Sequence, residues 1–439
     1  MDTDEGPNDC RSKTQNSAIL QMKRPQQPGI LTLTAGSIKE EGTERIEGNE
    51  AELILRHEQI CAAMVSNTFQ LLMKDPDYIN HKSIMAAFIL EREVNSKSGK
   101  FDKYEVVAIG TGNSCYQGWQ EYNGLLVHDS HALVVARRSL LRYLYKQLNL
   151  HYSGLSQAKE KCIFCHSEKT QMLVLKPGIF LHLYLNALPE GCTQVNPPWA
   201  HATPFISLHV HAKGSLLSLS ECPPCFLASR VYCLSALDKI MKWNVLGIQG
   251  ALLSQIIDPI YIISIVTGPQ EKQSLHHALS EKRKLSLDLS LFPSYYMHTP
   301  YILCGSSIFT NKTPVKHSNH SLNWCRGDSH VEIVDGAKGK TVDCSAAQFP
   351  ISRLCKAAML MCYWRLKNAN GKSPGPISYS QSKSSSDQYQ QVKTLFHTQF
   401  CAPGQGSWPH KLCVDKFEML PKGFPDRDAG LFFQCDLHS

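Results

Sequence analysis

The sequence predicts an α/β fold in which one mixed β-sheet is flanked by helices. Apolar runs typical of buried strands alternate along the chain with segments of helical periodicity. Between residues 51 and 439 neither an internal repeat nor a clear linker interrupts this alternation, so we expect one large domain. Residues 1–50 are rich in Gly, Glu, Thr, Gln and Pro, and we expect them to be disordered.

Local patterns predict the individual elements. Helical spacing starts at residue 51 in AELILRHEQICAAMVSNTFQLLM, and MAAFILERE and KYEVVAIGTG are then typical of strands. A helix is expected over 130–148, capped by Asp129 or Ser130. A strand in GIFLHLYLNALPEG, a helix–turn–helix in SALDKIMKWNVLGIQGALLSQI and a strand in PIYIISIVTG follow. Two further helices are expected at 350–366 and 387–400, separated by a polar loop in NANGKSPGPISYSQSKSSS.

Composition narrows the class of protein. The chain has 439 residues and a formal net charge of +7, which permits a nucleic-acid partner but does not require one. The N-terminal MDTDEGPNDCRSK is acidic and has no apolar run, unlike a secretory signal, so the 17 cysteines are expected to be reduced thiols inside the cell. The most apolar stretch, ALLSQIIDPIYIISIV, is interrupted by Asp258 and Pro259, and we expect no membrane span.

The helix predicted over 130–148 contains the triplet His131, Ala132, Leu133 near its start. Zinc-dependent base deaminases carry a His-x-Glu motif, in which the histidine binds zinc and the glutamate moves protons. His131 matches the zinc ligand, whereas Leu133 occupies the position of the glutamate. A leucine side chain neither donates nor accepts a proton, so the triplet lacks half of the required chemistry.

Several segments together resemble the editase domain of adenosine deaminases acting on RNA. In family order they are HALVVARRSLLRYLYKQL, LHLYLNALPEG, SALDKIMKWNVLGIQGALLS, DPIYIISIVTG, LNWCRGDSHVEIVDGAKGKT, SRLCKAAML and GQGSW. The resemblance is strongest to the germ-cell adenosine-deaminase-domain proteins of this family. It implies a cytidine-deaminase-like core elaborated into one A-to-I editase domain over residues 51–439.

By this resemblance the family's two zinc cysteines fall on Glu190 and Ala236. A catalytic zinc site needs three protein ligands and one water, and His131 with Glu190 supplies only two ligands. Without bound metal no water is acidified, and without a carboxylate at Leu133 no side chain moves its protons. We therefore expect no catalytic residue, no zinc and no deaminase activity, and we expect His131 to be a satisfied core histidine.

Displaced cysteines are the alternative source of metal ligands. Two Cys-x-x-Cys pairs are present, Cys162/Cys165 and Cys222/Cys225, and such pairs occur in tetrahedral zinc sites. They lie too far apart for a zinc ribbon and match no ligand position of the family. Cys192 and Cys233 are nearer in sequence to the vacated positions. Ordinary thiols are the default expectation, and a structural metal at the two pairs stays open.

The resemblance also implies a structural cofactor, one inositol hexakisphosphate in the domain core. The matching positions here are Arg137, Arg138, Lys239, Lys242, Lys356, Tyr379, Lys383, Tyr389, Lys393, Trp408 and Lys411. At His128 and His410 the family's Asn and Glu are absent. Buried cations need counter-charges, and the sequence shows no carboxylate cluster for this many. Tyr389 and Lys393, four residues apart, are expected to share one helix face.

Double-stranded RNA is the implied partner. The stretch that corresponds to the family's base-flipping loop lacks a Gly-Glu-Gly, although its basic side chains could contact phosphates, as could the run SEKRKLS. These candidates are His209, His211, Lys213, Lys282, Arg283 and Lys284. We find no upstream double-stranded RNA-binding domain in the short leading segment. We therefore expect RNA binding that is weak and insensitive to base sequence.

These features predict a pseudoenzyme, an inactive editase-like domain that acts as an RNA-associated factor in RNA processing and germ-cell differentiation during spermatogenesis. Its expected partners are RNA and other germ-cell RNA-processing proteins, without membrane contact. Its expected location is the nucleus, with the cytoplasm as a second compartment. Two alternatives stay open: an active adenosine-to-inosine deaminase that uses displaced metal ligands, and a protein-interaction scaffold without RNA contact.

Overall fold

In the computed structural model the description covers most of the chain from residue 54 onward. The described residues are 22–23, 31–33, 54–96, 99–118, 123–192, 204–206, 208–212, 215–219, 222, 232–305, 317–342, 350–369, 378–401 and 415–417. Among the expected site residues, Lys213, Cys225, Trp408, His410 and Lys411 lie outside these ranges.

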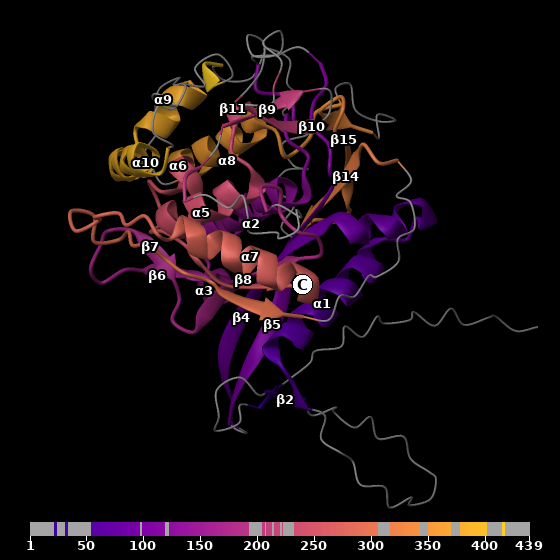
Figure 1. Ribbon diagram of the computed structural model, residues 1–439. Helices are drawn as coiled ribbons and strands as arrows, with labels where there is room; N and C mark the ends of the chain where they lie inside the picture. The colour runs from indigo at the N-terminus through magenta and orange to yellow at the C-terminus, as the bar shows by residue number, and fades with distance from the viewer. Residues whose placement is uncertain are drawn as a thin grey trace, which may run out of the picture.

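An eight-stranded mixed sheet is the central element, in the order β13-β12-β8-β4-β5-β14-β15-β16 (Figure 1). The parallel strands are β8, β12 and β13, and antiparallel pairing continues from β8 through β4 and β5 to β16. The strand bounds are Met85–Ser96 (β4), Gly99–Thr111 (β5), Ile179–Leu185 (β8), Ile262–Thr267 (β12), Tyr301–Cys304 (β13), His320–Cys325 (β14), Glu332–Asp335 (β15) and Lys340–Thr341 (β16). The predicted mixed sheet is confirmed.

Each face of this sheet carries its own apolar core. Along β4 the side chains alternate, so Ala86, Phe88 and Leu90 pack in the core that contains α2, whereas Ala87 and Ile89 pack in the core that contains α1. The helix bounds are His57–Leu72 (α1) and Ala132–Tyr152 (α2). We call these two surfaces the α2 face and the α1 face of the sheet.

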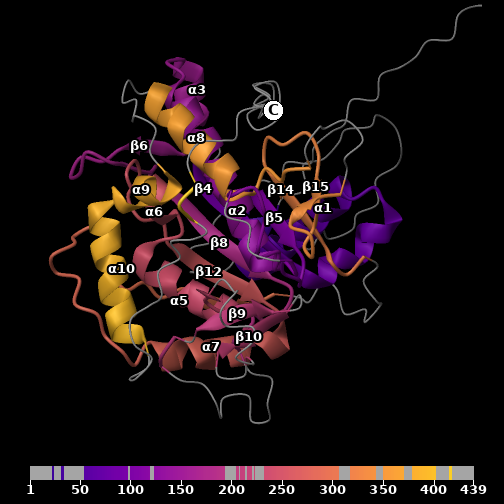
Figure 2. The same ribbon diagram turned by 90° about the horizontal axis from the view of Figure 1, so that it is seen from above.

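More helices cover the α2 face (Figure 2). They are α5 (Ala236–Leu246), α6 (Gly250–Leu253), α7 (Pro269–Lys282) and α8 (Lys356–Ala369), with α9 (Tyr379–Ser384) and α10 (Asp387–Phe400) next to them. A third apolar cluster joins α5 to α10 through Met241, Val245, Val392 and Phe396. Helix α10 therefore packs against α5, although the two helices are far apart in sequence.

Shorter elements complete the description. They are β1 (Met22–Lys23), β2 (Leu31–Leu33), β3 (Ile54–Leu55), the 3-10 helix Pro76–Ile84, α3 (Ser156–Lys161), β6 (Phe164–His166), β7 (Leu173–Leu175), β9 (His209–Ala212), β10 (Ser215–Ser218) and β11 (Tyr232–Cys233). β1, β2 and β3 form one small sheet, and β9, β10 and β11 form another. Among the described residues no helix is both long and apolar enough to cross a membrane.

Most predicted elements are present, but several differ in bounds or kind; the helix predicted over 350–366, for example, is α8, Lys356–Ala369. Strands β1 and β2 fall within the segment expected to be disordered, and α1 begins at His57 because Ile54–Leu55 pairs with β2. The predicted caps of α2 are wrong: His131 is its N-cap residue and makes no side-chain capping bond. The second helix predicted after residue 247 is only Gly250–Leu253. The expected polar loop contains α9, whose start is stabilised by a capping box of Ser378 and Gln381.

Candidate functional site

The residues that match the deaminase motif lie where α2 begins, on the α2 face of the sheet. Gly110 of β5 brings the strand against the first turn of this helix, since a Cβ atom there would lie 2.2 Å from the Ala136 nitrogen. The Ala132 nitrogen donates a hydrogen bond to the Gly112 carbonyl at 2.8 Å. These contacts fix His131 at the edge of the core, with its side chain nearly buried.

Both ring nitrogens of His131 face carboxylates. Its Nδ1 lies 2.8 Å from Oδ1 of Asp129, and its Nε2 lies 2.9 Å from Oε1 of Glu190. Gly191, with φ 92°, allows the turn that carries Glu190 to pass close to Ser235, whose Oγ would lie 2.5 Å from a Cβ at Gly191. The prediction of a satisfied histidine is therefore correct, and its partners are two acids.

These two acids change the charge state of the imidazole. Burial opposes protonation of His131, but hydrogen bonds to Asp129 and Glu190 and the charges of both carboxylates outweigh it and raise its pKa to about 10. At neutral pH the ring is an imidazolium, which donates from both nitrogens. A catalytic zinc takes three protein ligands, and the side chains of His131 and Glu190 supply two of them here.

The other two altered positions are apolar and belong to the core. Leu133 and Ala236 are buried members of the cluster that also contains Leu237 and Trp243. Ala236 is the first residue of α5, which Ser235 caps by accepting a hydrogen bond from the Asp238 nitrogen at 3.1 Å. Neither position offers an atom for metal binding or proton transfer.

Asp129 is the centre of a charge network that the sequence analysis considered only as a cap. Besides His131, it binds Lys239 at 2.7 Å and faces Nε2 of His211 at 3.7 Å. Burial alone would raise the pKa of Asp129, but Lys239, His131 and His211 hold it well below its ordinary value. One buried carboxylate thus faces three cationic or titratable side chains.

The cysteines near the vacated positions do not rebuild the family's ligand set. Burial raises the pKa of Cys192 to about 12, so its sulfur is a protonated thiol. Cys233 lies beside His211, whose charge outweighs burial and lowers the pKa of its thiol. Of the Cys-x-x-Cys pairs, Cys162 donates its S–H to the Gln147 carbonyl at 3.1 Å. Within the described part of the chain, no group of three potential metal ligands includes any of these cysteines.

Part of the set expected to bind inositol hexakisphosphate gathers between α2, α9 and α10. The guanidinium of Arg137 lies 5.3 Å from the ring centre of Trp243, and its Nε donates to the Ile248 carbonyl. Arg137 also interacts electrostatically with Arg138, Tyr379 and Tyr389. Lys383 lies over the Tyr379 ring at 5.0 Å. Residues from three separate segments therefore meet at one place.

The charges at this place fit an anion. Burial and the neighbouring charge of Arg138 lower the pKa of Arg137. Among the described groups that act on Arg137 there is no carboxylate to raise it. Lys356 and Lys383 both bind the carboxylate of Asp415, at 2.7 Å each. Arg137 and Lys383, which both act on Tyr389, form a cationic place that a polyphosphate would neutralise.

Other expected members of the set lie elsewhere or are only partly buried. Lys239 binds Asp129 in the network described above, and Lys393 is half-buried with its Nζ 3.4 Å from the amide oxygen of Gln390. Lys242 is partly exposed on α5. Tyr389 is buried as expected, so Tyr389 and Lys393 differ in burial although they are four residues apart.

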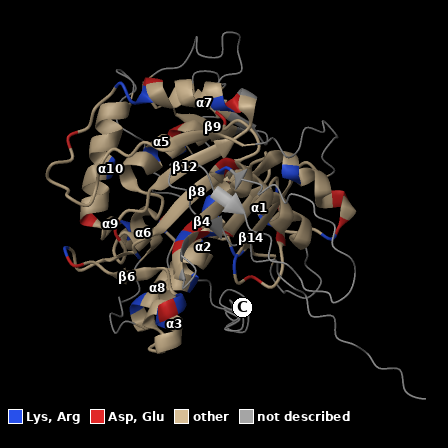
Figure 3. Cartoon of the chain, turned by 90° about the horizontal axis from the view of Figure 1, so that it is seen from below, with Lys and Arg blue, Asp and Glu red and all other residues tan. Residues whose placement is uncertain are grey.

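Two of the candidates for RNA contact are in fact buried. Lys282 makes an ion pair with Asp238 at 2.6 Å and is 6% exposed, and His211 is equally enclosed beside Asp129. Arg283 and Lys284 remain exposed at the end of α7. In Figure 3 Lys and Arg positions lie next to Asp and Glu positions on α3 and α7. Any phosphate contact therefore depends on separate exposed residues.

A buried ion cluster that the sequence analysis missed anchors α2 to the turn after β14. Asp328 binds Arg142 at 2.7 Å, Lys146 at 2.7 Å and Arg353 at 3.3 Å. The spacing of Arg142 and Lys146, one helical turn apart, was the available signal. All four side chains are almost inaccessible to solvent, so the cluster is structural rather than a ligand site.

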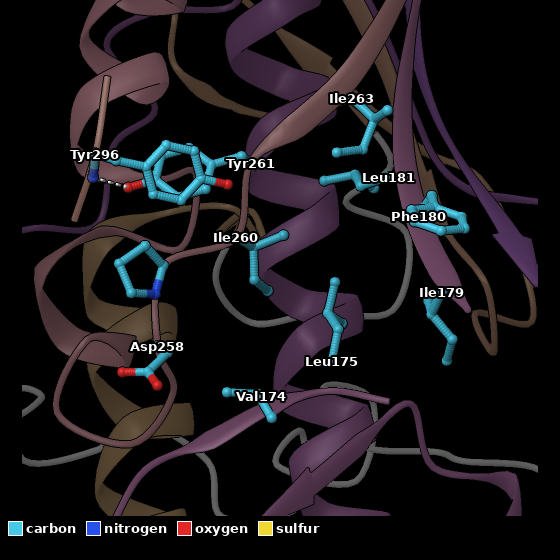
Figure 4. Close-up of a pocket in the computed structure, with 11 residues that line it drawn as sticks. Val174, Leu175, Ile179, Phe180, Leu181, Asp258, Ile260, Tyr261, Ile263 and Tyr296 are labelled. Carbon is cyan, nitrogen blue, oxygen red and sulfur yellow. Dashed lines mark hydrogen bonds between the residues drawn. The ribbon is translucent and has the colours of Figure 1, made fainter. Parts of the chain in front are cut away.

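A surface pocket of about 150 Å³ lies apart from these charged groups (Figure 4). Its lining is mostly aliphatic, including Val174, Ile179 and Ile260. The Tyr296 nitrogen donates to the Tyr261 hydroxyl at 3.2 Å, and Asp258 accepts a hydrogen bond from Thr170. These groups are already satisfied, and the pocket offers no set of groups for acid–base or metal chemistry.

A family model of the adenosine-deaminase (editase) domain matches residues 108–412. The chain is 30% identical to mouse double-stranded RNA-specific editase B2 over 76% of this chain and 46% of the relative. It is 27% identical to Drosophila melanogaster double-stranded RNA-specific editase Adar over 83% of this chain and 55% of the relative. A Drosophila tRNA-specific adenosine deaminase 1 is 32% identical over 37% of this chain and 43% of the relative. The chain thus spans about half the length of these relatives.

Proposed function

This chain belongs to the adenosine-deaminase (editase) domain family, and from that premise we propose that it is a catalytically inactive member acting as an RNA-associated factor. One observation carries the proposal: Leu133 and Ala236 are buried, apolar members of the core. Deamination of adenosine needs a zinc-activated water and a carboxylate that moves its protons. By the resemblance Leu133 stands where that carboxylate would be, and without a ligand at Ala236 only His131 and Glu190 remain for a zinc that needs three.

The test is inosine formation in duplex RNA by the wild-type chain and by stepwise restorations. We expect none from the wild type, none from Leu133→Glu, and none from Glu190→Cys with Ala236→Cys. Leu133→Glu alone has no activated water, while the two cysteines alone lack the group whose contribution is typically about 10²–10⁴-fold. The cysteine at 190 also removes the carboxylate that occupies Nε2 of His131. Only the triple variant combines a free ligand set with a proton carrier.

Inosine made by the wild-type chain above a mock purification would overturn the proposal in favour of an active deaminase. A wild-type chain without activity, assayed beside an active editase on the same RNA, supports it. Because members of a catalytic unit act together, each partial restoration is expected to be as inactive as the wild type.

We propose that the RNA contact is weak and directed at the phosphate backbone. The relatives are named for double-stranded RNA, and this chain has a net charge of +7 with exposed Arg283 and Lys284. Phosphate contacts release counterions, so the logarithm of affinity should fall steeply with the logarithm of salt concentration. Filter binding of one duplex at several salt concentrations measures the slope. No binding even at low salt would favour a protein-interaction scaffold.

Inositol hexakisphosphate is proposed as a structural ligand held by Arg137, Arg138, Lys356, Lys383 and Tyr389. When bound it would supply the negative charge that this group of cations lacks. Phosphorus analysis of the purified chain, followed by mass spectrometry of the released small molecules, tests this ligand. About six phosphorus atoms per chain are expected from its six phosphates; a phosphorus-free folded chain would contradict it.

The resemblance to germ-cell proteins extends the proposal to RNA processing and spermatogenesis, with a nuclear location and the cytoplasm as a second compartment. Expected partners are other germ-cell RNA-processing proteins. Antibody staining of testis sections tests the location: signal in nuclei of spermatogenic cells supports it, and signal confined to somatic cells contradicts it.

A further inference from the structure

Three side chains with metal-ligating atoms converge on the α1 face of the sheet, opposite the altered deaminase residues. They are His57 in the first turn of α1, Glu91 on β4 and His182 on β8. One ligand atom from each lies within 4.8 Å of the other two. In the described part of the chain no other group of His, Cys, Asp and Glu residues meets this condition. The sequence analysis missed it because the three residues lie on separate elements.

Sheet register explains the convergence. Ile89 of β4 is directly opposite His182 of β8, and Glu91 lies two residues after Ile89, on the same face. The core on this face includes Val65, Ile89, Val106 and Val266. Two histidines and a glutamate in such surroundings need a reason to be there.

The separations between these atoms match those around a metal ion. Nδ1 of His57 lies 3.4 Å from Oε2 of Glu91, and Nε2 of His182 lies 3.1 Å from the same oxygen. Ligands bound at about 2.0–2.2 Å in a tetrahedral arrangement lie roughly 3.3–3.6 Å from one another. Nε2 of His182 is buried and faces the Glu91 oxygen, with which it would share the ion.

The opposite ring nitrogens are both held by one hydroxyl group. Oγ of Ser264 lies 3.1 Å from Nε2 of His57 and 2.8 Å from Nδ1 of His182. An oxygen with two lone pairs can accept an N–H from each ring. In the tautomers that donate both N–H groups to Ser264, the lone pairs of the opposite nitrogens face Glu91, and that of His57 also meets the Tyr104 hydroxyl. Metal-binding histidines are commonly oriented by such a second hydrogen bond.

Neighbouring groups define the remaining coordination position. The Tyr104 hydroxyl lies 2.9 Å from Nδ1 of His57, so it borders the space between the three ligand atoms. The Cys61 sulfur lies 3.6 Å from Nε2 of His57, the nitrogen that faces Ser264, and is therefore directed away from that space. His57 is 17% exposed, whereas Glu91 and His182 are 11% and 4% exposed, which gives an ion one route of entry past His57.

We propose that His57, Glu91 and His182 bind one Zn²⁺, with water beside the Tyr104 hydroxyl in the fourth position. Two imidazoles and one carboxylate form a ligand set that suits zinc. The ion would join α1 to strands β4 and β8 and so fasten the helix to the sheet. The sequence predicts that zinc is absent from the chain, on the ground of the lost ligands at Glu190 and Ala236. This proposal departs from that prediction, because it concerns the other face of the sheet, and it is independent of deaminase activity.

The test is the zinc content of the purified full chain after dialysis against metal-free buffer, measured by inductively coupled plasma mass spectrometry. About one zinc per wild-type chain is expected. Glu91→Gln and His182→Ala should lose it, and Ser264→Ala should weaken zinc affinity by roughly 10–100-fold. Cobalt reconstitution provides a second readout, because Co²⁺ in a tetrahedral site absorbs visible light that Glu91→Gln should abolish.

Matched controls separate this site from other sources of metal. Glu93→Gln changes an exposed glutamate on the same strand, and Glu190→Gln changes the carboxylate next to His131; both should retain the zinc. The proposal is overturned if the folded wild-type chain holds no zinc after zinc loading. It is also overturned if Ser264→Ala and Glu91→Gln both retain zinc with unchanged affinity. If Glu91→Gln does not fold, the affinity of Ser264→Ala decides between these results.

Discussion

The two faces of the sheet use histidine in opposite ways. On the α2 face, His131 has a carboxylate at each nitrogen and its pKa is raised to about 10. On the α1 face, His57 and His182 share one carboxylate oxygen, and burial lowers the pKa of His182. The first arrangement stabilises a cation, and the second brings two imidazole rings and one carboxylate within the distances of a ligand set.

This difference teaches that a retained histidine says little by itself about a retained metal site. The role of the imidazole depends on how many carboxylates contact it and on which group contacts its other ring nitrogen. Glu190, which by the resemblance stands where the family has a zinc cysteine, pairs with His131, whereas the Ser264 hydroxyl contacts one ring nitrogen of His57 and one of His182. Three experiments test this difference between the two faces.

The largest effect is expected from Asp129→Asn. This change leaves Lys239, His131 and His211 without their shared anion, and removing one partner of a buried pair costs about 3–5 kcal/mol. Urea denaturation measures the loss in free energy of unfolding. Glu190→Gln is the control, because Glu190 is 42% exposed and its pair should contribute roughly 1 kcal/mol or less. Equal losses in the two variants would mean that Asp129 does not organise the α2 face.

A smaller effect should appear in the pH dependence of stability. The pKa of His131 is raised in the folded chain to about 10, so its stabilising charge is fully present below the ordinary value of 6.5 and is lost as pH rises toward 10. His131→Asn should therefore be less stable than the wild type by on the order of 2 kcal/mol near pH 6, after allowance for solvent screening of Glu190. The difference should shrink as pH approaches 10. A difference that grows with pH would show a neutral His131.

The smallest effect is expected from Cys61→Ala on the α1 face. Its sulfur faces the nitrogen of His57 that we place toward Ser264, so it is not a ligand in the proposed zinc site. The variant should keep its zinc and lose only about 1 kcal/mol of stability, a typical value for a buried substitution. Calorimetry and metal analysis of the same sample check both points. Loss of zinc would mean that the ring of His57 is turned and that Cys61 binds the ion.

Much of the fold could be predicted because it depends on neighbouring residues. The alternation in MAAFILERE places Ala86, Phe88 and Leu90 on one face, and the structure confirms that these side chains share a core. The boundaries near residues 51 and 130 were wrong, because strand pairing of Ile54–Leu55 and contacts of His131 with distant residues override local preference.

By itself the sequence determined the kinds of side chain at each altered catalytic position. Leu133 and Ala236 cannot bind metal or carry protons in any fold, and the structure places both in the core. Only the tertiary structure decided the partners: Glu190 reaches His131, Lys282 is buried on Asp238, and His57, Glu91 and His182 meet across three elements. The physical reason is that periodicity is encoded within a few residues, whereas ion pairs and ligand sets depend on the order and register of strands that are distant in the chain.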